Sequence, residues 1–187
     1  MIQQSKIERR QLLSEAEGYL ELAVCFDDRW PLEDEIRDQL TARCLESLEK
    51  IENPRGRRAQ IYYLRGQALR LSNQYEPAIE ALEQSWHLES QNVHTCLALG
   101  WCYKRTDRLE EAVEAMQLGL SVEPGSAILH YNLACYFSLL ARTRKAIKHL
   151  NQAIEINDSL RDLINEEGDF DSIRKDPAFV AATEKYC

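Results

Sequence analysis

Apolar residues recur at every third or fourth position along almost the whole chain, which is the spacing of an amphipathic helix. The first stripe of this kind consists of Leu13, Ala16, Leu20 and Ala23. The second consists of Ile36, Leu40, Cys44, Leu48 and Ile51. The two stripes predict helices over residues 7–26 and 32–51. The pattern then continues and predicts further helices at 58–72, 75–88, 93–105, 109–121, 127–140 and 143–156.

The later helices repeat with a fixed period of about 34 residues, the unit length of one family of helical repeats. Shifting the sequence by one period superimposes segments 59–92, 93–126 and 127–160. Position 8 of the segments holds the small residues Gly66, Gly100 and Ala134, and position 20 holds Ala78, Ala112 and Ala146. A glycine inside a helix costs about 0.5–1 kcal/mol relative to alanine. We therefore expect the two helices of each segment to approach closely at these positions, with Gly100 facing Ala112.

Small residues at positions 8, 20 and 27, combined with large apolar residues at positions 4, 11 and 24, resemble the tetratricopeptide repeat (TPR) family. The resemblance covers 102 of 187 residues. It implies an all-α fold of antiparallel helix pairs, stacked as a right-handed superhelix, or α-solenoid. It also implies a single TPR domain over residues 1–187. That domain would consist of a degenerate leading helix pair (1–57), three repeats (58–160) and a C-terminal cap (161–187).

In the cap, we expect a short turn around residues 169–173 and a final helix from about Asp176, with Pro177 in its first turn. Because TPR arrays often end in a tail helix, the resemblance implies that apolar residues here cover the last repeat. These are Phe170, Ile173, Phe179 and Val180. The Asp-x-Asp sequence at 169–171 lacks the remaining ligands and the glycine of a calcium loop, so we expect no metal.

Composition and charge narrow the range of partners. The chain is 44% hydrophobic and 29% charged, with a net charge of −8. Since nucleic acids and anionic membranes attract a positive surface, we expect neither as a partner. No secretion signal is present at the N-terminus and no apolar run reaches the roughly 20 residues of a membrane span, which favours a cytoplasmic location. The six cysteines form no C-x-x-C pair, and we expect them to be buried and reduced.

The sequence contains no recognisable catalytic or cofactor-binding constellation. It lacks a nucleophile elbow, a P-loop, an H-E-x-x-H motif and a dinucleotide fingerprint. Among the histidines, His130 falls on a core position of the repeat, whereas His149 falls on an outward position where we expect it to be solvated. We therefore expect the chain not to be an enzyme and to need no cofactor.

TPR proteins usually hold an extended peptide or a helix in a concave groove, and the resemblance implies the same here. The groove is lined by positions 2, 5, 9, 12 and 13 of the first helices. The resulting candidates are Tyr63, Gln67, Arg70, His94, Leu97, Trp101, Lys104, Arg105, Ile128, Tyr131, Cys135 and Ser138. Aromatic residues with a basic rim suit a partner segment that has both apolar and acidic residues. In the alternative interpretation, the chain's own flanking helices fill the groove, and these aromatics are ordinary core.

The leading hypothesis is a protein–protein interaction adaptor or scaffold. One subclass is excluded, namely the TPR cochaperones that grip the C-terminal carboxylate of Hsp70 or Hsp90 with lysine, asparagine and arginine at five set positions. None of the residues at those positions matches: Tyr63, Gln67, Ala98, Ile128 and Asn132. Two further hypotheses stay open, a dedicated small TPR chaperone for an apolar client and a homo-oligomeric structural or regulatory unit.

Overall fold

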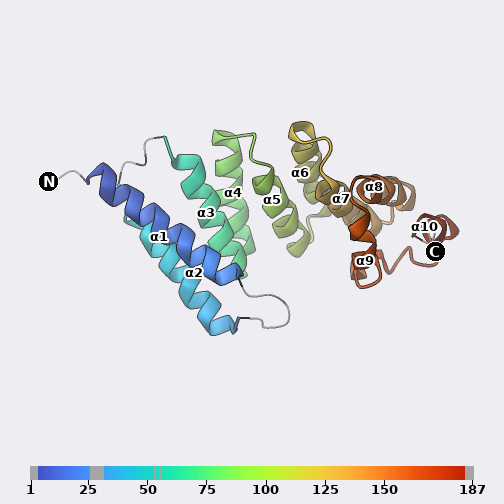
Figure 1. Ribbon diagram of the computed structural model, residues 1–187, viewed down its shortest axis with the longest axis horizontal. Helices are drawn as coiled ribbons and strands as arrows, with labels where there is room; N and C mark the ends of the chain where they lie inside the picture. The colour runs from blue at the N-terminus through green and yellow to red at the C-terminus, as the bar shows by residue number, and fades with distance from the viewer. Residues whose placement is uncertain (1–3, 26–31, 53, 55, 184–187) are drawn as a thin grey trace. The chain divides into compact units, whose positions relative to one another are not determined.

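The computed structural model describes residues 4–25, 32–52, 54 and 56–183, and in those ranges the chain forms helices and no strand (Figure 1). The helices are α1 (Lys6–Val24), α2 (Asp34–Glu49), α3 (Arg58–Leu71), α4 (Tyr75–Leu88), α5 (Val93–Arg105), α6 (Leu109–Val122), α7 (Ala127–Leu139), α8 (Thr143–Ile156), α9 (Arg161–Ile164) and α10 (Pro177–Thr183). Two 3-10 segments, η1 (Asp158–Leu160) and η2 (Gly168–Phe170), lie between α8 and α10. The all-α prediction is confirmed, and the helices α2–α8 begin and end close to their predicted bounds. The predicted end of the first helix, residue 26, lies outside the described residues.

Contacts divide the chain into two compact units, Met1–Cys102 and Tyr103–Cys187, called here the first and the second unit. The boundary falls within α5, so the predicted repeat 93–126 contributes to both units. Each unit is described by itself below. The organisation of residues 1–187 as a single domain stays a prediction.

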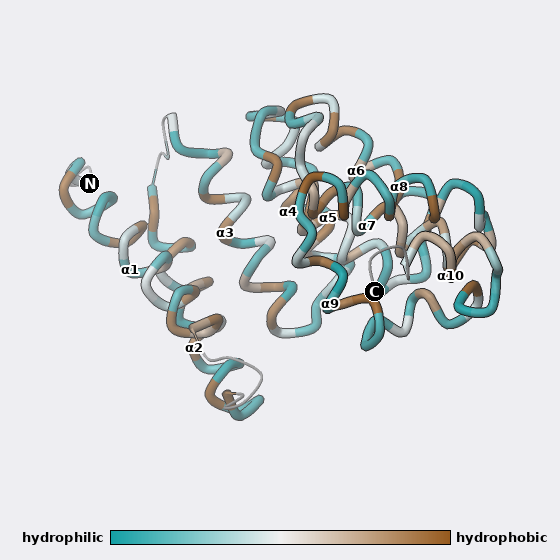
Figure 2. Tube along the Cα trace, turned by 45° about the vertical axis from the view of Figure 1, so that its right-hand side comes forward, coloured by the Kyte–Doolittle hydropathy of each residue, from teal (hydrophilic) through white to brown (hydrophobic). Residues whose placement is uncertain are grey.

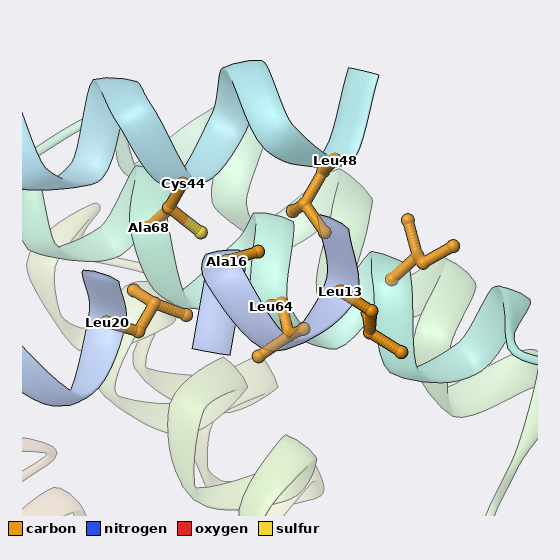
Figure 3. Packing of buried hydrophobic residues seen from close by; sticks show 8 residues of the cluster. Leu13, Ala16, Leu20, Cys44, Leu48, Leu64 and Ala68 are labelled. Carbon is orange, nitrogen blue, oxygen red and sulfur yellow. The ribbon is translucent and has the colours of Figure 1, made fainter. Parts of the chain in front are cut away.

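The core of the first unit lies among α1, α2 and α3 (Figure 3). Leu13, Ala16 and Leu20 of α1 pack with Cys44 and Leu48 of α2 and with Leu64 and Ala68 of α3. The first stripe is thus confirmed as the buried face of α1. The second stripe is buried only in its C-terminal part, since Ile36, near the start of α2, is 42% exposed. In Figure 2 the alternation of hydrophobic and hydrophilic stretches can be followed along these helices.

A close approach of paired helices is visible at Gly66 on α3. A Cβ atom at this position would lie 2.5 Å from Cγ of Leu82 and 3.3 Å from the backbone oxygen of Ala78, both on α4. Leu82 is completely buried, and its Cγ or the backbone would have to shift to make room for such an atom. The expectation for positions 8 and 20 is therefore confirmed in the segment 59–92. Gly100 is buried as well, and its proximity to Ala112 stays a prediction.

The same period also appears in the backbone of the turns, where Asn73, Asp107 and Ala141 adopt positive φ values of 59°, 59° and 55°. In each turn the backbone N–H of the next residue donates a hydrogen bond to the carbonyl oxygen five residues earlier. In the first turn this bond runs from Gln74 to Leu69 at 2.9 Å. This is the Schellman arrangement, which ends a helix with one residue in the left-handed region. The second helices accordingly begin at equivalent residues, Tyr75, Leu109 and Thr143.

In the second unit, α7 lies between α6, α8 and the tail, and nearly all of its residues from Leu129 to Ser138 are buried. The tail residues predicted to cover the last repeat do so. Phe170, Ile173 and Phe179 are at most 4% exposed, and Val180 is half-buried. The predicted turn and final helix are confirmed as η2 and α10, with Pro177 as the first residue of α10.

The stretch between α8 and η2 is more ordered than the sequence predicted. The sequence pattern assigns no element to this stretch, whereas the structure forms η1 and α9 there. The side chain of Asn157 accepts a hydrogen bond from the backbone N–H of Ser159 and so starts this turn. Leu160 and Ile164, four positions apart, are buried on the same side of it.

Candidate functional site

The groove candidates of the first unit form one connected line of side chains. The amide of Gln67 donates a hydrogen bond to the hydroxyl of Tyr63 at 2.9 Å, and Nε of Arg70 donates one to the amide oxygen of Gln67, also at 2.9 Å. The guanidinium of Arg70 lies 5.1 Å from the ring centroid of Trp101. The three residues of α3 share one side of the helix because they are three and four positions apart. We call Tyr63, Gln67, Arg70 and Trp101 the first-unit face.

Trp101 is half-buried. This is intermediate between the exposed side chain expected in an open groove and the buried one expected if the chain fills its own groove. Its ring meets Tyr75 edge-on, with a centroid distance of 5.4 Å and an interplanar angle of 69°. It also contacts the guanidinium of Arg70. A cation over an indole face gains roughly 0.5–2 kcal/mol, depending on how far it is desolvated. Trp101 therefore positions Arg70 and at the same time belongs to the packing of the first unit.

A depression of about 320 Å³ adjoins Arg70 between α1 and α3. It is lined by Glu17, Leu20, Glu21, Val24, Tyr63, Leu64, Gln67, Arg70 and Leu71. Val24 is 56% exposed, so part of this apolar surface is open to solvent. The arrangement places an apolar hollow directly beside a guanidinium.

Arg70 is a half-buried cation whose neighbours give it no opposite charge. Desolvation lowers the pKa of its guanidinium, and the groups that oppose this shift are the thiol of Cys102 and two phenols, which are neutral at pH 7, rather than a carboxylate. Within the described ranges, no carboxylate forms an ion pair with Arg70. Glu17, on the wall of the depression, accepts a hydrogen bond from Gln60 at 2.5 Å instead. Since arginine stays protonated at neutral pH, Arg70 places one positive charge at the rim of a depression that also contains the carboxylates of Glu17 and Glu21.

The remaining groove candidates of the first unit are less constrained. His94 is exposed, and Leu97 is half-buried. Both lie on α5, whose first turn carries His94. They are available as peripheral contacts, whereas Arg70 and Trp101 form the fixed part of the surface.

In the second unit, the tail covers the corresponding positions of α7. Tyr131, Cys135 and Ser138 are 4%, 2% and 0% exposed. Phe170 meets the ring of Tyr131 edge-on at a centroid distance of 5.8 Å, and the hydroxyls of Ser138 and Ser172 lie 3.3 Å apart. For these three candidates, the alternative in which the chain fills its own groove is the one that the structure shows.

Lys104 is also engaged by the tail, since its ammonium forms an ion pair with the carboxylate of Asp169. The two side chains are only 30% and 12% exposed. Asp169 and Phe170 together are an acidic and an aromatic residue, which is the chemistry that the groove positions predicted for a partner segment. The sequence offered the charge complementarity of Lys104 and Asp169 as a signal, but nothing in it showed that two residues so far apart in the chain would meet. Arg105 and Ile128, the other candidates of this unit, are exposed.

Two histidines of the second unit form a pair. His130 is 7% exposed, which confirms it as a core residue. The prediction that His149 is solvated is wrong, because its Nδ1 lies 3.0 Å from Nδ1 of His130 and its ring stacks on Phe137 at 5.5 Å. Burial, and then the proximity of His130, lower the pKa of His149 to about 4. In an ideal repeat this position points outward, but here the His149 side chain lies against α7 and is therefore half-buried.

Most cysteines behave as small buried hydrophobes. Cys44, Cys96, Cys102 and Cys135 are buried and form no disulfide among the described residues, and burial raises the pKa of the first three to about 12. Cys25 departs from the prediction, because it is exposed just after the end of α1. Cys187 lies outside the described residues.

Comparison with known families decides the assignment that the period and the turns suggest. Two models of the tetratricopeptide repeat match, one over residues 69–134 and one over residues 127–159. Residues 69–159 belong to the tetratricopeptide repeat family. TPR modules are typically non-enzymatic and mediate protein interactions. The leading helix pair, α1 and α2, precedes the matched residues.

Solved structures share the TPR fold of the chain. A crystal structure of the MamA protein superimposes with a TM-score of 0.66 at 20% identity, covering 82% of this chain and 75% of MamA. YrrB, described as a TPR protein with an unusual peptide-binding site, gives a TM-score of 0.55 at 21% identity, covering 67% of this chain and 61% of YrrB. No curated protein matches the chain. Among its described helices, none combines the length and apolar character that crossing a membrane requires.

Proposed function

We propose that this TPR protein is an interaction adaptor or scaffold that binds an extended peptide or helix of a partner protein on the first-unit face. The partner segment presents a carboxylate to Arg70 and an apolar side chain to the neighbouring depression. His94 and Leu97 extend the contact along α5. No cofactor or metal takes part in this recognition.

The observation that supports the proposal most directly is the state of Arg70. Its guanidinium has given up part of its hydration without gaining a carboxylate among the described residues. Its orientation is set by Gln67 on one side and Trp101 on the other. A pre-oriented guanidinium can bind a carboxylate with two parallel hydrogen bonds, which are about twice as strong as neutral ones.

The second unit offers an internal precedent for this chemistry. Lys104 follows Arg70 by one repeat period, so both occupy position 12 of their repeats. Lys104 pairs with Asp169, and the next tail residue, Phe170, packs on Tyr131. An acidic residue followed by an aromatic one is therefore a suitable first model for a segment that Arg70 would accept. The peptide-binding site named for YrrB is consistent with a peptide partner for a TPR protein of this fold.

The test is a peptide selection on the full-length protein. A library of random displayed peptides should yield binders in which Asp or Glu stands next to an aromatic or aliphatic residue. Arg70→Met should weaken the selected peptides by roughly 30-fold, the effect of losing a hot-spot residue worth about 2 kcal/mol. Arg43→Met is the matched control, because Arg43 is an exposed arginine on α2. Selected peptides that lack acidic residues, or that bind the Arg70 variant equally well, would contradict the proposed site.

A further inference from the structure

A second cluster of reactive side chains lies where the tail meets α7. Cys135 of α7 and the carboxylates of Glu167 and Asp169 each place one ligand atom within 4.8 Å of the other two. Cys135 is 2% exposed, and the side chain of Asp169 is 12% exposed. The sequence pointed to Asp169 and Asp171 as a pair, but Asp171 turns outward and forms an ion pair with Arg174 at 2.7 Å. The neighbours of Asp169 in the cluster are therefore Cys135, which is distant in the sequence, and Glu167, rather than Asp171.

A buried hydroxyl without a hydrogen-bond partner among the described residues belongs to Tyr131, on the same helix as Cys135. Tyr131 is 4% exposed. It lies one helical turn before Cys135 on the same side of α7. Burial, and then the neighbouring Cys135, Glu167 and Asp169, raise the pKa of the Tyr131 hydroxyl. Leaving such a group unsatisfied costs roughly 1–3 kcal/mol, which a bound ion or its water would relieve.

The charges of the cluster do not balance. Lys104 offers one positive charge against the two carboxylates. Arg174 pairs with Asp171, and it also donates hydrogen bonds to the backbone oxygens of Ile164 and Glu167. Burial and then the two carboxylates raise the pKa of the Cys135 thiol, so without an ion it stays protonated. With the thiol ionised, Cys135, Glu167, Asp169 and Lys104 together hold a charge of about −2, which one divalent cation neutralises.

We propose that Cys135, Glu167 and Asp169 bind a zinc ion that fastens the tail to α7. A thiolate selects a borderline-soft metal over magnesium or calcium, and Zn²⁺ accepts sulfur together with carboxylate oxygen in a tetrahedral set. The fourth position is left to the Tyr131 hydroxyl or to a water molecule bonded to it. Binding replaces the S–H bond of Cys135 by a Zn–S bond and releases the proton to solvent, with no change of oxidation state. The inference is independent of the proposed peptide site in the first unit.

Cobalt(II) is the probe for this site, because a Co²⁺–thiolate bond gives a near-ultraviolet charge-transfer band and tetrahedral Co²⁺ gives intense visible bands. The measurement uses the full chain with Cys25 and Cys187 replaced by serine, which removes the exposed thiol and the terminal one. We expect one equivalent of Co²⁺ to give both signals, and Zn²⁺ to displace it. Zn²⁺ should also raise the thermal midpoint in proportion to the logarithm of its free concentration.

Three variants separate this site from adventitious binding. Cys135→Ser is nearly isosteric, should fold, and should abolish the thiolate band. Asp169→Asn and Glu167→Gln should each weaken Zn²⁺ binding by roughly 100-fold, at least the effect of losing an outer-shell partner. Asp171→Asn is the control and should bind Zn²⁺ like the parent. The proposal is overturned if the parent shows no thiolate band at one equivalent of Co²⁺. It is also overturned if the band survives in Cys135→Ser, or if Asp171→Asn impairs binding as much as Asp169→Asn.

Discussion

The two units use the same face of the repeat in different ways. In the first unit, the cation at position 12 is Arg70, which stacks on Trp101 beside an apolar depression and pairs with no carboxylate of the described residues. In the second unit, the cation at position 12 is Lys104, which pairs with Asp169 while Phe170 covers Tyr131. The groove position of the repeat thus carries a half-buried cation in the first unit, where we propose that a partner binds, and belongs to an internal packing surface in the second. In the second unit the tail itself supplies the acidic residue, Asp169, and the aromatic residue, Phe170, that cover this surface.

The largest effect is expected from removing the aromatic ring of the tail. Phe170 is completely buried between Tyr131 and Phe179. Phe170→Ala should destabilise the second unit by about 3–5 kcal/mol, since it leaves a cavity in a closed core. Urea unfolding of the full chain measures this loss. Leu163→Ala, at a tail residue that is 50% exposed, is the control and should change stability by about 0.5 kcal/mol or less. A loss for Phe170→Ala no larger than that of the control would mean that the tail is not part of the core.

Two helix-interior glycines allow a matched test of packing in the first unit. A Cβ atom at Gly66 would collide with Leu82, so Gly66→Ala should destabilise by about 1–3 kcal/mol despite the better helix propensity of alanine. Gly18 on α1 has no atom within 4 Å of the same probe position. Gly18→Ala should therefore stabilise by about 0.5–1 kcal/mol. Thermal melts of both variants give the comparison, and equal signs would refute the close approach at position 8.

Lys104→Met tests whether the tail is held electrostatically as well as by packing. The substitution keeps the length of the side chain and leaves the carboxylate of Asp169 buried without its cation. We expect a loss of about 1–3 kcal/mol, the cost of an unsatisfied buried polar group. Chemical denaturation measures the loss. The double variant Lys104→Met/Asp169→Asn should recover part of it, and the absence of any recovery would show that the two residues act independently.

The features that could be predicted from the sequence are those that depend on local spacing. The helices, their repeat period and the small residue at position 8 follow from side-chain spacing alone. The docking of Asp169 on Lys104 could not be predicted, because it depends on how α9 and η2 redirect the chain after the last repeat. The burial of His149 could not be predicted either, because its position is outward in an ideal repeat, whereas here its side chain meets His130. The type of side chain at each repeat position could therefore be predicted, whereas the residue that it contacts could not.

Acid should weaken the second unit through His149. Its pKa in the folded state is about 4, below its ordinary value of 6.5, so between these values the unfolded chain binds more protons than the folded one. Stability should therefore decrease as the pH falls from 6.5 to about 4, and this contribution should level off below that. His130, Lys145 and Lys148 oppose protonation in the folded state. Urea midpoints recorded across this range should show a flatter profile for His149→Gln, while His94→Gln, an exposed histidine of the first unit, should follow the parent. A His149 variant with the parental slope would contradict the assignment.

The smallest effect on stability, and the most informative one, is expected at Arg70. Replacing it with methionine removes the contact with Trp101, worth roughly 0.5–1 kcal/mol, and one hydrogen bond to Gln67. It also relieves the desolvation of a guanidinium that has no opposite charge among the described residues, so the two changes offset each other. We expect Arg70→Met to alter the free energy of unfolding by less than about 1 kcal/mol, whereas Lys104→Met at the equivalent position costs more. Denaturation of both variants side by side decides this. A loss at Arg70 as large as that at Lys104 would show that Arg70 is part of the internal packing, and the surface for a partner would then have to lie elsewhere in the first unit.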